Sequence, residues 1–126
     1  MPLFQMQIET EHPILFLSDS ESTISPNVTG HEFVTATHDC LCFLVLSYVD
    51  GASLVTVTDK ACEAVGQKLF TGNIGAASGT LTVTDSHGFR YLNVPVPVGQ
   101  LSVEIWADDE KNPDWVWVKL GAIQSC

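Results

Sequence analysis

The sequence contains few basic residues and no long hydrophobic run. Only 5 of its 126 residues are Lys or Arg, against 15 Asp and Glu, so the formal net charge is −10. Proteins that bind DNA or RNA through the phosphate backbone, or that are drawn to an anionic membrane surface, carry the opposite sign. We therefore predict no direct nucleic-acid partner and no membrane partner. The acidity favours a basic protein partner, although it is equally typical of a domain whose charge serves only solubility.

The hydrophobic residues are divided among short runs. The longest of them, residues 40–46, is far shorter than the roughly 20 residues of a membrane-spanning helix. The first residues, MPLFQMQIETEH, lack the basic residues and the apolar core of a secretory signal, which indicates a cytoplasmic protein. With 45% hydrophobic and 16% charged residues, the composition is that of a globular protein, and the length predicts a single domain over residues 1–126.

Cysteine is too sparse for a disulfide framework or a structural zinc site. The chain has Cys40, Cys42, Cys62 and Cys126, and no second Cys or His pair follows the C-x-C pair at zinc-finger spacing. Because Cys40 and Cys42 stand two apart in an apolar run, a strand would point both thiols to the same face. We predict that they are buried free thiols, acting as small apolar side chains.

Signature motifs of catalysis and of phosphate binding are also missing. Neither H-E-x-x-H nor G-x-S-x-G occurs, and the Gly-rich stretch TGNIGAASG has no phosphate-binding fingerprint, so we interpret it as a mobile connection. The histidines, which fall in predicted turns or at strand ends, are His12, His31, His38 and His87. We therefore expect a protein that is not an enzyme and that needs no cofactor and no metal.

What the sequence does contain is short segments of alternating apolar and polar residues between turn residues. The strands that these segments predict cover residues 4–8, 30–37, 40–49, 54–57, 68–70, 79–84 and 89–94. The segment 40–49 is apolar on both faces, as in a central strand. The turn residues Asp50-Gly51 predict that it forms a hairpin with the segment 54–57.

One short helix and one sheet edge complete the prediction. KACEAV, residues 60–65, follows Thr58 or Asp59 as a helix cap. Pro95 and Pro97 exclude a central, hydrogen-bonded position and predict an edge or a crossover between sheets. The predicted fold is all-β, a two-sheet antiparallel β-sandwich of about eight to ten strands with one short helix.

Two apolar triplets alternate along the strands on either side of the loop 107–114. They are Leu101, Val103 and Ile105, and Val116, Val118 and Leu120. Both triplets face the core if Ile105 pairs with Val116, Val103 with Val118 and Leu101 with Leu120. The same register sets Trp106 beside Trp115 and Glu104 beside Trp117 on the opposite face. We therefore predict an aromatic cluster on the outer face, next to the loop.

This aromatic cluster and the acidic loop form the candidate site, because exposed Trp beside carboxylates is typical of a protein-binding hot spot. The predicted partner-binding residues are Trp106, Asp108, Asp109, Glu110, Asp114, Trp115 and Trp117. Two plainer interpretations stay open. The Trp residues can be a cross-strand pair covered by the N-terminal segment, and the loop, which lacks D-x-D-x-D-G spacing, can be a solvated acidic turn rather than a calcium site.

The order of these elements resembles that of the competence protein J family, acidic inhibitors of the bacterial DNA-entry nuclease. The resemblance is carried by an early FQMQIE strand, an acidic loop, and HEFVTATHDCLCFLVLSY as a strand, a turn and a long apolar strand. It continues with GTLTVTDSHGFRYLNVPVPVGQLSVEIWA, which has a proline-glycine turn and a last strand that ends at Trp. It implies a β-sandwich that binds a basic nuclease and blocks it, offering carboxylates in place of DNA phosphates.

Two interpretations from other classes of protein remain open. One is a β-sandwich that binds a carbohydrate or another planar ligand on Trp106, Trp115 and Trp117. The other is a structural module that forms a homo-oligomer, with an uncovered edge at Pro95–Pro97 as its contact.

Overall fold

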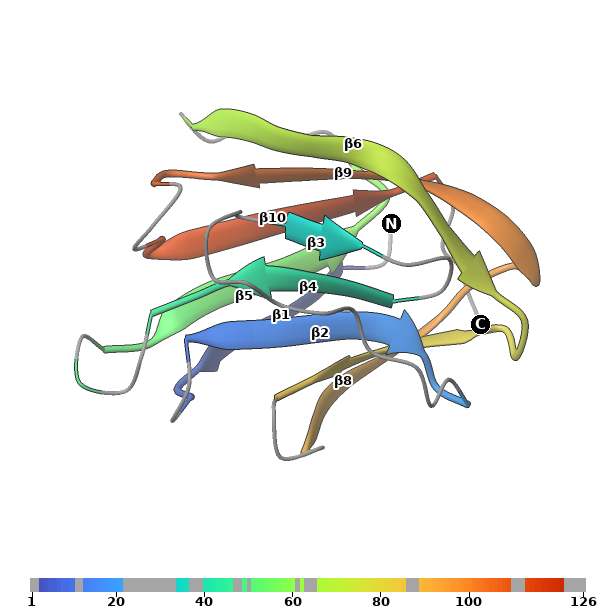
Figure 1. The fold of residues 1–126 in the computed structure, drawn as a ribbon, viewed down its shortest axis with the longest axis horizontal. Helices are drawn as coiled ribbons and strands as arrows, with labels where there is room; N and C mark the ends of the chain where they lie inside the picture. Colours follow the sequence, from blue (N-terminus) through green and yellow to red (C-terminus); the bar gives the residue numbers. More distant parts are fainter. Residues whose placement is uncertain are drawn as a thin grey trace.

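Ten strands in two sheets are formed by the residues that the computed structural model describes: 3–10, 13–21, 34–36, 40–46, 49, 51–60, 62, 66–85, 89–109 and 113–121. In chain order they are β1 (Leu3–Ile8), β2 (Ile14–Asp19), β3 (Val34–Ala36), β4 (Cys40–Leu44), β5 (Ser53–Thr58), β6 (Gln67–Ala76), β7 (Thr80–Thr84), β8 (Arg90–Pro95), β9 (Gly99–Ala107) and β10 (Trp115–Leu120). The first sheet has the order β1-β5-β10-β9-β6 and the second β3-β4-β2-β7-β8 (Figure 1). Neighbouring strands are antiparallel except for the parallel pair of β5 and β10. The predicted two-sheet β-sandwich is therefore confirmed.

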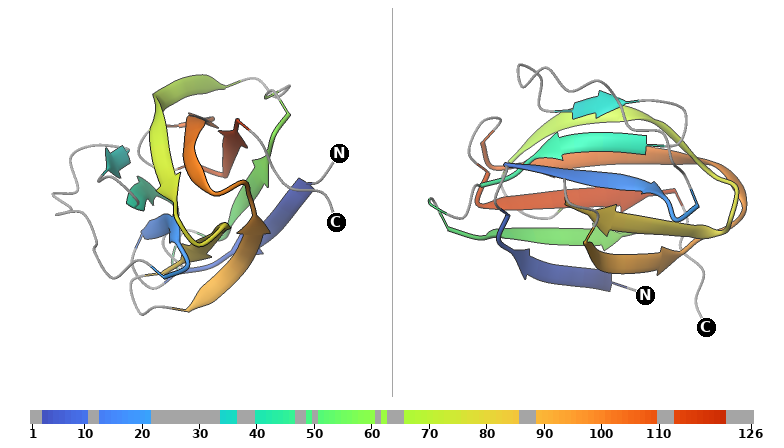
Figure 2. Two further views of the ribbon diagram at one scale, coloured as in Figure 1. Left: turned by 90° about the vertical axis from the view of Figure 1, so that its right-hand side faces the viewer. Right: turned by 60° about the horizontal axis from the view of Figure 1, so that its bottom comes forward.

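The two sheets face each other across an apolar core (Figure 2). Successive side chains of a strand point to opposite faces, so every second residue turns inward. Val55 and Val57 of β5 and Leu15 and Leu17 of β2 are fully buried in this way. Each such burial contributes about 1.5–3 kcal/mol relative to an exposed side chain, so the alternation in the sequence is what holds the sheets together.

One edge of the sandwich lies where the sequence predicted an edge or a crossover. Pro95 ends β8, the edge strand of the second sheet, and the chain then crosses to β9 in the first sheet, as the two prolines predict. The first strand is confirmed as β1, with Ile8 fully buried. Met6 on the same strand is 39% exposed, because an edge strand has no neighbour on one side to cover its inward-facing residues.

The hairpin expected around Asp50-Gly51 is wrong. Strand β4 belongs to the second sheet, and β5 belongs to the first sheet, between β1 and β10. Gly51 does have a positive φ of 118°, as expected of a turn glycine. It lies, however, in the connection from one sheet to the other and not in a hairpin. The N–H of Leu46, just beyond β4, donates to the hydroxyl of Ser53 at 2.9 Å instead of to a ladder partner. Both strands have an apolar inner face, and their places in the two different sheets turn both faces into the core between the sheets.

The interpretation of TGNIGAASG as a mobile connection is also wrong. Most of it belongs to β6, which pairs with β9 from Gln67 opposite Ala107 to Ala76 opposite Gly99, with a bulge after Lys68. Small residues have low strand propensity. Here the segment is nevertheless a strand, because it pairs with β9 and buries Ile74 and Ala76 in the core. At Gly72 an added Cβ would lie 2.7 Å from the ring of Phe70, so the ring packs directly over the backbone of this glycine.

The predicted short helix falls mostly on residues 61 and 63–65, outside the described part of the chain. Among its described residues, Lys60 and Cys62 are not helical, and Thr58, one of the two expected caps, is the last residue of β5. The Thr58 hydroxyl accepts a hydrogen bond from the Lys60 N–H at 3.3 Å, so it ends the strand in a turn. No helix long and apolar enough to cross a membrane occurs in the described ranges.

Candidate functional site

The two apolar triplets and the tryptophans lie on the faces predicted for them, but the register between β9 and β10 is different. All six triplet residues are buried, and the tryptophans are half-buried on the outer face. Ile105 pairs with Val118 rather than Val116, and Trp106 pairs with Trp117 rather than Trp115. A slip of two residues keeps every side chain on its face, so the apolar pattern cannot detect it.

The acidic loop fixes this register. The Asp108 carboxylate accepts hydrogen bonds from the backbone N–H of Asp114 at 2.9 Å and of Trp115 at 3.3 Å. These bonds close the loop, so that the ladder resumes only with Val116 opposite Ala107. Asp108 therefore uses its carboxylate within the chain.

The far side of the loop is fastened to β5. The hydroxyl of Ser53, which is fully buried, donates to the carbonyl oxygen of Pro113 at 2.7 Å, and the Leu54 N–H donates to the carbonyl of Asp114 at 2.9 Å. With its backbone held at both ends, the loop presents the exposed side chains of Asp109 and Asp114 on a fixed base. Glu110, the fourth acidic residue of the predicted site, lies outside the described residues.

Trp115 and Trp117 contact the connection between β5 and β6, at its described residues Lys60 and Gly66. The indole N–H of Trp117 donates to the carbonyl oxygen of Lys60 at 3.0 Å. An added Cβ at Gly66 would lie 2.4 Å from Cη2 of Trp115, so the chain passes directly against that ring. Trp106 and Trp117 stand opposite each other and form the cross-strand aromatic pair of the plainer interpretation. The backbone of Lys60 lies against Trp117.

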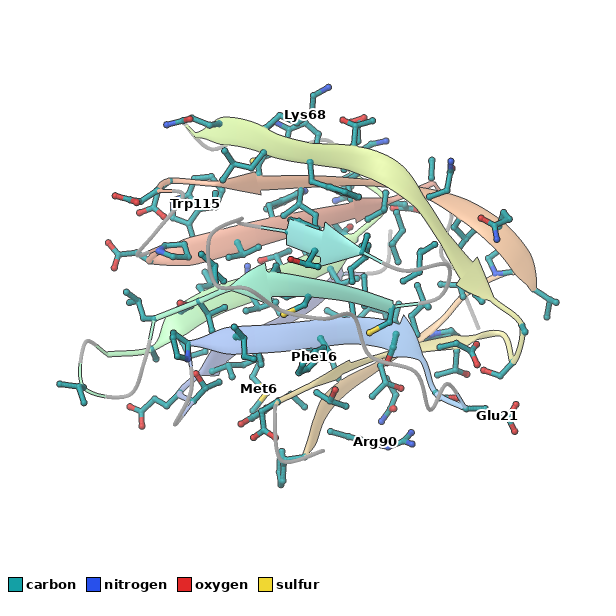
Figure 3. The ribbon with its side chains drawn as sticks, viewed as in Figure 1. Met6, Phe16, Glu21, Lys68, Arg90 and Trp115 are labelled. Atoms are coloured by element: carbon teal, nitrogen blue, oxygen red, sulfur yellow. The ribbon has the colours of Figure 1, made fainter. Side chains whose placement is uncertain are left out.

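Three of the chain's five basic residues gather on this same face. Lys68 lies on the edge strand β6, where Figure 3 labels it. Its ammonium group lies 5.7 Å from the ring centroid of Trp106 and 4.0 Å from the Glu104 carboxylate. Lys119 stands opposite Glu104 in the register of β9 and β10, and the backbone of Lys60 contacts Trp117. Exposed contacts of this kind contribute about 0.5–1 kcal/mol each at most. On the tryptophan face these three Lys residues therefore outnumber Glu104, while Asp108, Asp109 and Asp114 lie on the loop.

The cysteines behave as predicted where they are described. Cys40 and Cys42 are buried free thiols. Burial raises the pKa of the Cys42 thiol to about 11, so the group is neutral at physiological pH. Cys62 is half-buried, and Cys126 lies outside the described residues, as do all four histidines. No group of three or more His, Cys, Asp or Glu that could hold a metal ion is found in the described ranges.

Sequence reasoning did not single out the turn between β7 and β8. Phe89 is 61% exposed, and its ring lies 4.8 Å from that of Tyr91, tilted by 59°. Asp85 accepts from the Phe89 N–H at 3.0 Å and from the Tyr91 hydroxyl at 2.9 Å. Burial, together with the hydrogen bond and the charge of Asp85, raises the pKa of Tyr91 to about 12. The signal in the sequence was an aromatic residue directly after a turn, which the alternation rule counts only as a strand residue.

Asp19 is a second residue that the pattern did not reveal. It is 5% exposed at the end of β2, where its carboxylate accepts from the Ser78 N–H at 2.9 Å, the Ser78 hydroxyl at 2.7 Å and the Glu21 N–H at 3.1 Å. Burial by itself would raise the pKa of Asp19, but these hydrogen bonds outweigh it and hold the pKa below its usual value. The group ties β2 to the turn between β6 and β7 and is structural.

Comparison with known proteins gives a match in fold. The crystal structure of ComJ from Bacillus subtilis, inhibitor of the DNA degrading activity of NucA, aligns with a TM-score of 0.70 over 93% of this chain and 93% of ComJ, at 10% sequence identity. The chain has the fold of ComJ. A protein named Crocagin biosynthetic gene J aligns with a TM-score of 0.62 over 94% of this chain and 96% of its own, at 12% identity. No family model matches the sequence, and neither does any curated protein. The resemblance inferred from the sequence is thus confirmed as a similarity of fold.

Proposed function

We propose that this chain belongs with the competence protein J family and that it binds and inhibits a DNA-degrading nuclease, acting by binding alone. The observation that carries the proposal is the match in fold to ComJ along 93% of both chains. Because Crocagin biosynthetic gene J shares the fold, the fold by itself does not decide the function. The net charge of −10 is the independent support, since a nuclease presents a basic cleft to DNA.

The acidic loop is the part of the surface best suited to enter such a cleft. Asp109 and Asp114 are exposed, and the loop backbone is already held by Asp108 and Ser53. Backbone that is already held at residues 108 and 113–115 loses little conformational freedom there on binding, so more of the electrostatic attraction is retained as affinity. Glu110 would add a third carboxylate by its place in the sequence. Fields of this kind raise association rates by roughly 10- to 1,000-fold and weaken with salt.

In this proposal the predicted partner-binding residues divide into two groups. Asp109, Glu110 and Asp114 contact the nuclease. Asp109 and Asp114 are assigned to this group by the exposure of their side chains, and Glu110 by its place in the sequence. Asp108 has its carboxylate bonded to the backbone of Asp114 and Trp115, and the tryptophans contact Lys60 and Gly66, so we assign these residues to the support of the loop.

The alternative of a sugar-binding platform receives no support from the tryptophan face. Such a platform needs an open ring face and free polar groups at its rim. Trp117 uses its indole N–H on Lys60, the ring of Trp115 lies against Gly66, and Lys68 lies over Trp106.

The test is affinity capture on the immobilised chain from an extract of the source cell at low salt, followed by elution at high salt. We expect the eluate to degrade DNA, and we expect added chain to suppress that activity at a stoichiometric ratio. If the eluate lacks DNA-degrading activity, or if excess chain leaves the activity unchanged, the proposal is wrong. Heat-denatured chain on the same matrix controls for simple retention by charge.

A further inference from the structure

The turn between β7 and β8 exposes an aromatic side chain on a rigid base. Phe89 is 61% exposed, and its ring packs at a tilted angle of 59° against the ring of Tyr91, which is half-buried. We call Phe89 and Tyr91 the Phe89 patch. Single exposed apolar side chains are common on proteins, but Phe89 stands beside a second ring, and aromatic side chains are enriched in binding surfaces.

The Phe89 patch is held in place by hydrogen bonds rather than by burial. Asp85 and Phe89 exchange two bonds, from the Phe89 N–H to the carboxylate at 3.0 Å and from the Asp85 N–H to the Phe89 carbonyl at 3.2 Å. The hydroxyl of Tyr91 is shared between the Asp85 carboxylate at 2.9 Å and the carbonyl of Glu9 at 3.4 Å. The ring of Phe89 therefore stands on a fixed platform, which lowers the entropy lost when a partner covers it.

The surroundings of the patch indicate the charge of its partner. Asp85 and the exposed Glu9 lie at its rim, and the β-ladders place the acidic loop with Asp109 and Asp114 at the same end of the sandwich. Three of the four described basic residues lie instead on the tryptophan face, and the guanidinium of the fourth, Arg90, donates to the carbonyl of Ser20 at 3.0 Å. An apolar centre with an acidic rim is complementary to a basic protein surface.

We propose that the Phe89 patch is the apolar anchor by which this chain docks onto a basic protein; that this protein is a nuclease rests on the function proposed above. A second copy of the chain is the wrong occupant on grounds of charge. Patch-to-patch contact would bring Glu9 and Asp85 of both copies together in chains that each carry −10. Like charges at an interface oppose binding.

The test compares two exposed positions at opposite ends of the sandwich. In one variant p-benzoylphenylalanine replaces Phe89, and in the other it replaces Val98, which is 72% exposed between β8 and β9. Both are irradiated in an extract of the source cell, and the adducts are identified by mass spectrometry. We expect position 89 to give a salt-sensitive adduct with a protein of basic pI, and position 98 to give none.

The cross-linked protein is then purified and used as the binding probe. We expect Phe89→Ser to weaken its binding by about 10-fold or more relative to Val98→Ser, as for a hot-spot residue. We expect Glu9→Gln to slow association at low salt more than Glu21→Gln, which removes the same charge at the other end. Circular dichroism verifies that each variant is folded.

The outcomes separate this proposal from the proposed function. The absence of a specific adduct at position 89, an adduct with a second copy, or equal binding of Phe89→Ser and Val98→Ser overturns the docking proposal, whatever the nuclease assay shows. An adduct with a basic protein that degrades no DNA supports the docking surface and overturns the nuclease assignment.

Discussion

Trp117 donates its indole N–H to the carbonyl oxygen of Lys60 at 3.0 Å, and this bond ties the connection between β5 and β6 to the outer face of the first sheet. Two strands, β10 and β9, lie between β5 and β6 in the first sheet, so the chain has to pass both of them from the end of β5 to the start of β6. Trp115 and Trp117 therefore contact the described residues of this connection, Lys60 and Gly66, on the face where the sequence predicted a binding surface.

Removing this indole N–H is expected to weaken the fold modestly. Trp117→Phe keeps an aromatic ring on the sheet but leaves the Lys60 carbonyl without its donor. We expect the free energy of unfolding to fall by about 1 kcal/mol, measured by urea denaturation. Lys60→Ala is the control, because it retains the carbonyl and should change stability by less than about 0.5 kcal/mol. Equal effects of the two variants would show that the bond is not the cause.

Gly66 is expected to tolerate no side chain. A Cβ there would lie 2.4 Å from the Trp115 ring and 2.8 Å from the carbonyl oxygen of Ala107. We expect Gly66→Ala to lower the free energy of unfolding by about 1–3 kcal/mol, since the backbone at residue 66 has to move away from the sheet. Adding Trp115→Leu should recover part of the loss, because the ring is the nearer of the two obstacles. A melting temperature of Gly66→Ala equal to that of the unmodified chain would contradict this packing.

The sequence predicted which face of a sheet a side chain lies on better than it predicted which strands are neighbours, and the reason is physical. Alternation has a period of two, so it placed Val103 and Val118 in the core and the tryptophans outside without error. The same period leaves the register undetermined by two residues, and the hydrogen bonds of Asp108 settle it. The partner of a strand depends on the whole sheet, which is why β5 was assigned to the wrong neighbour.

The candidate site was only partly within reach of sequence reasoning. The acidic loop follows from composition, and two of its carboxylates are exposed. That Asp108 is engaged within the loop depends on backbone N–H groups six and seven residues further on, whose positions no pattern predicts. Phe89 lies directly before β8, an edge strand. Alternation did not predict its exposure, because at the edge of a sheet a side chain on either face can be exposed.

Substitutions of Asp108 and of Asp114 should have different effects, the first on stability and the second on binding. Asp108→Ala removes the acceptor of two hydrogen bonds and should lower the free energy of unfolding by about 1–2 kcal/mol, whereas Asp108→Asn keeps an acceptor oxygen and should cost less. Asp114→Asn retains the backbone bonds of that residue and should leave stability unchanged. On the proposed function, Asp114→Asn slows association with the inhibited nuclease at low salt, measured by surface plasmon resonance. The reverse pattern, with Asp114→Asn unstable and Asp108→Ala intact, would contradict these roles.

Asp19 should make the fold sensitive to acid. Its pKa is lowered in the folded chain because hydrogen bonds from Ser78 and Glu21 outweigh burial, while in the unfolded chain it returns to about 3.9. The unfolded state then takes up a proton first as the pH falls, so the stabilisation by Asp19 is fully present above about pH 4 and is lost as the pH drops through the lower folded value. Urea unfolding from pH 7 to pH 3 should show a shallower loss of stability in Asp19→Asn than in the unmodified chain. Ser78→Ala, which removes one donor to the carboxylate, should fall between them; parallel pH profiles of all three proteins would exclude Asp19 as the acid-sensitive group.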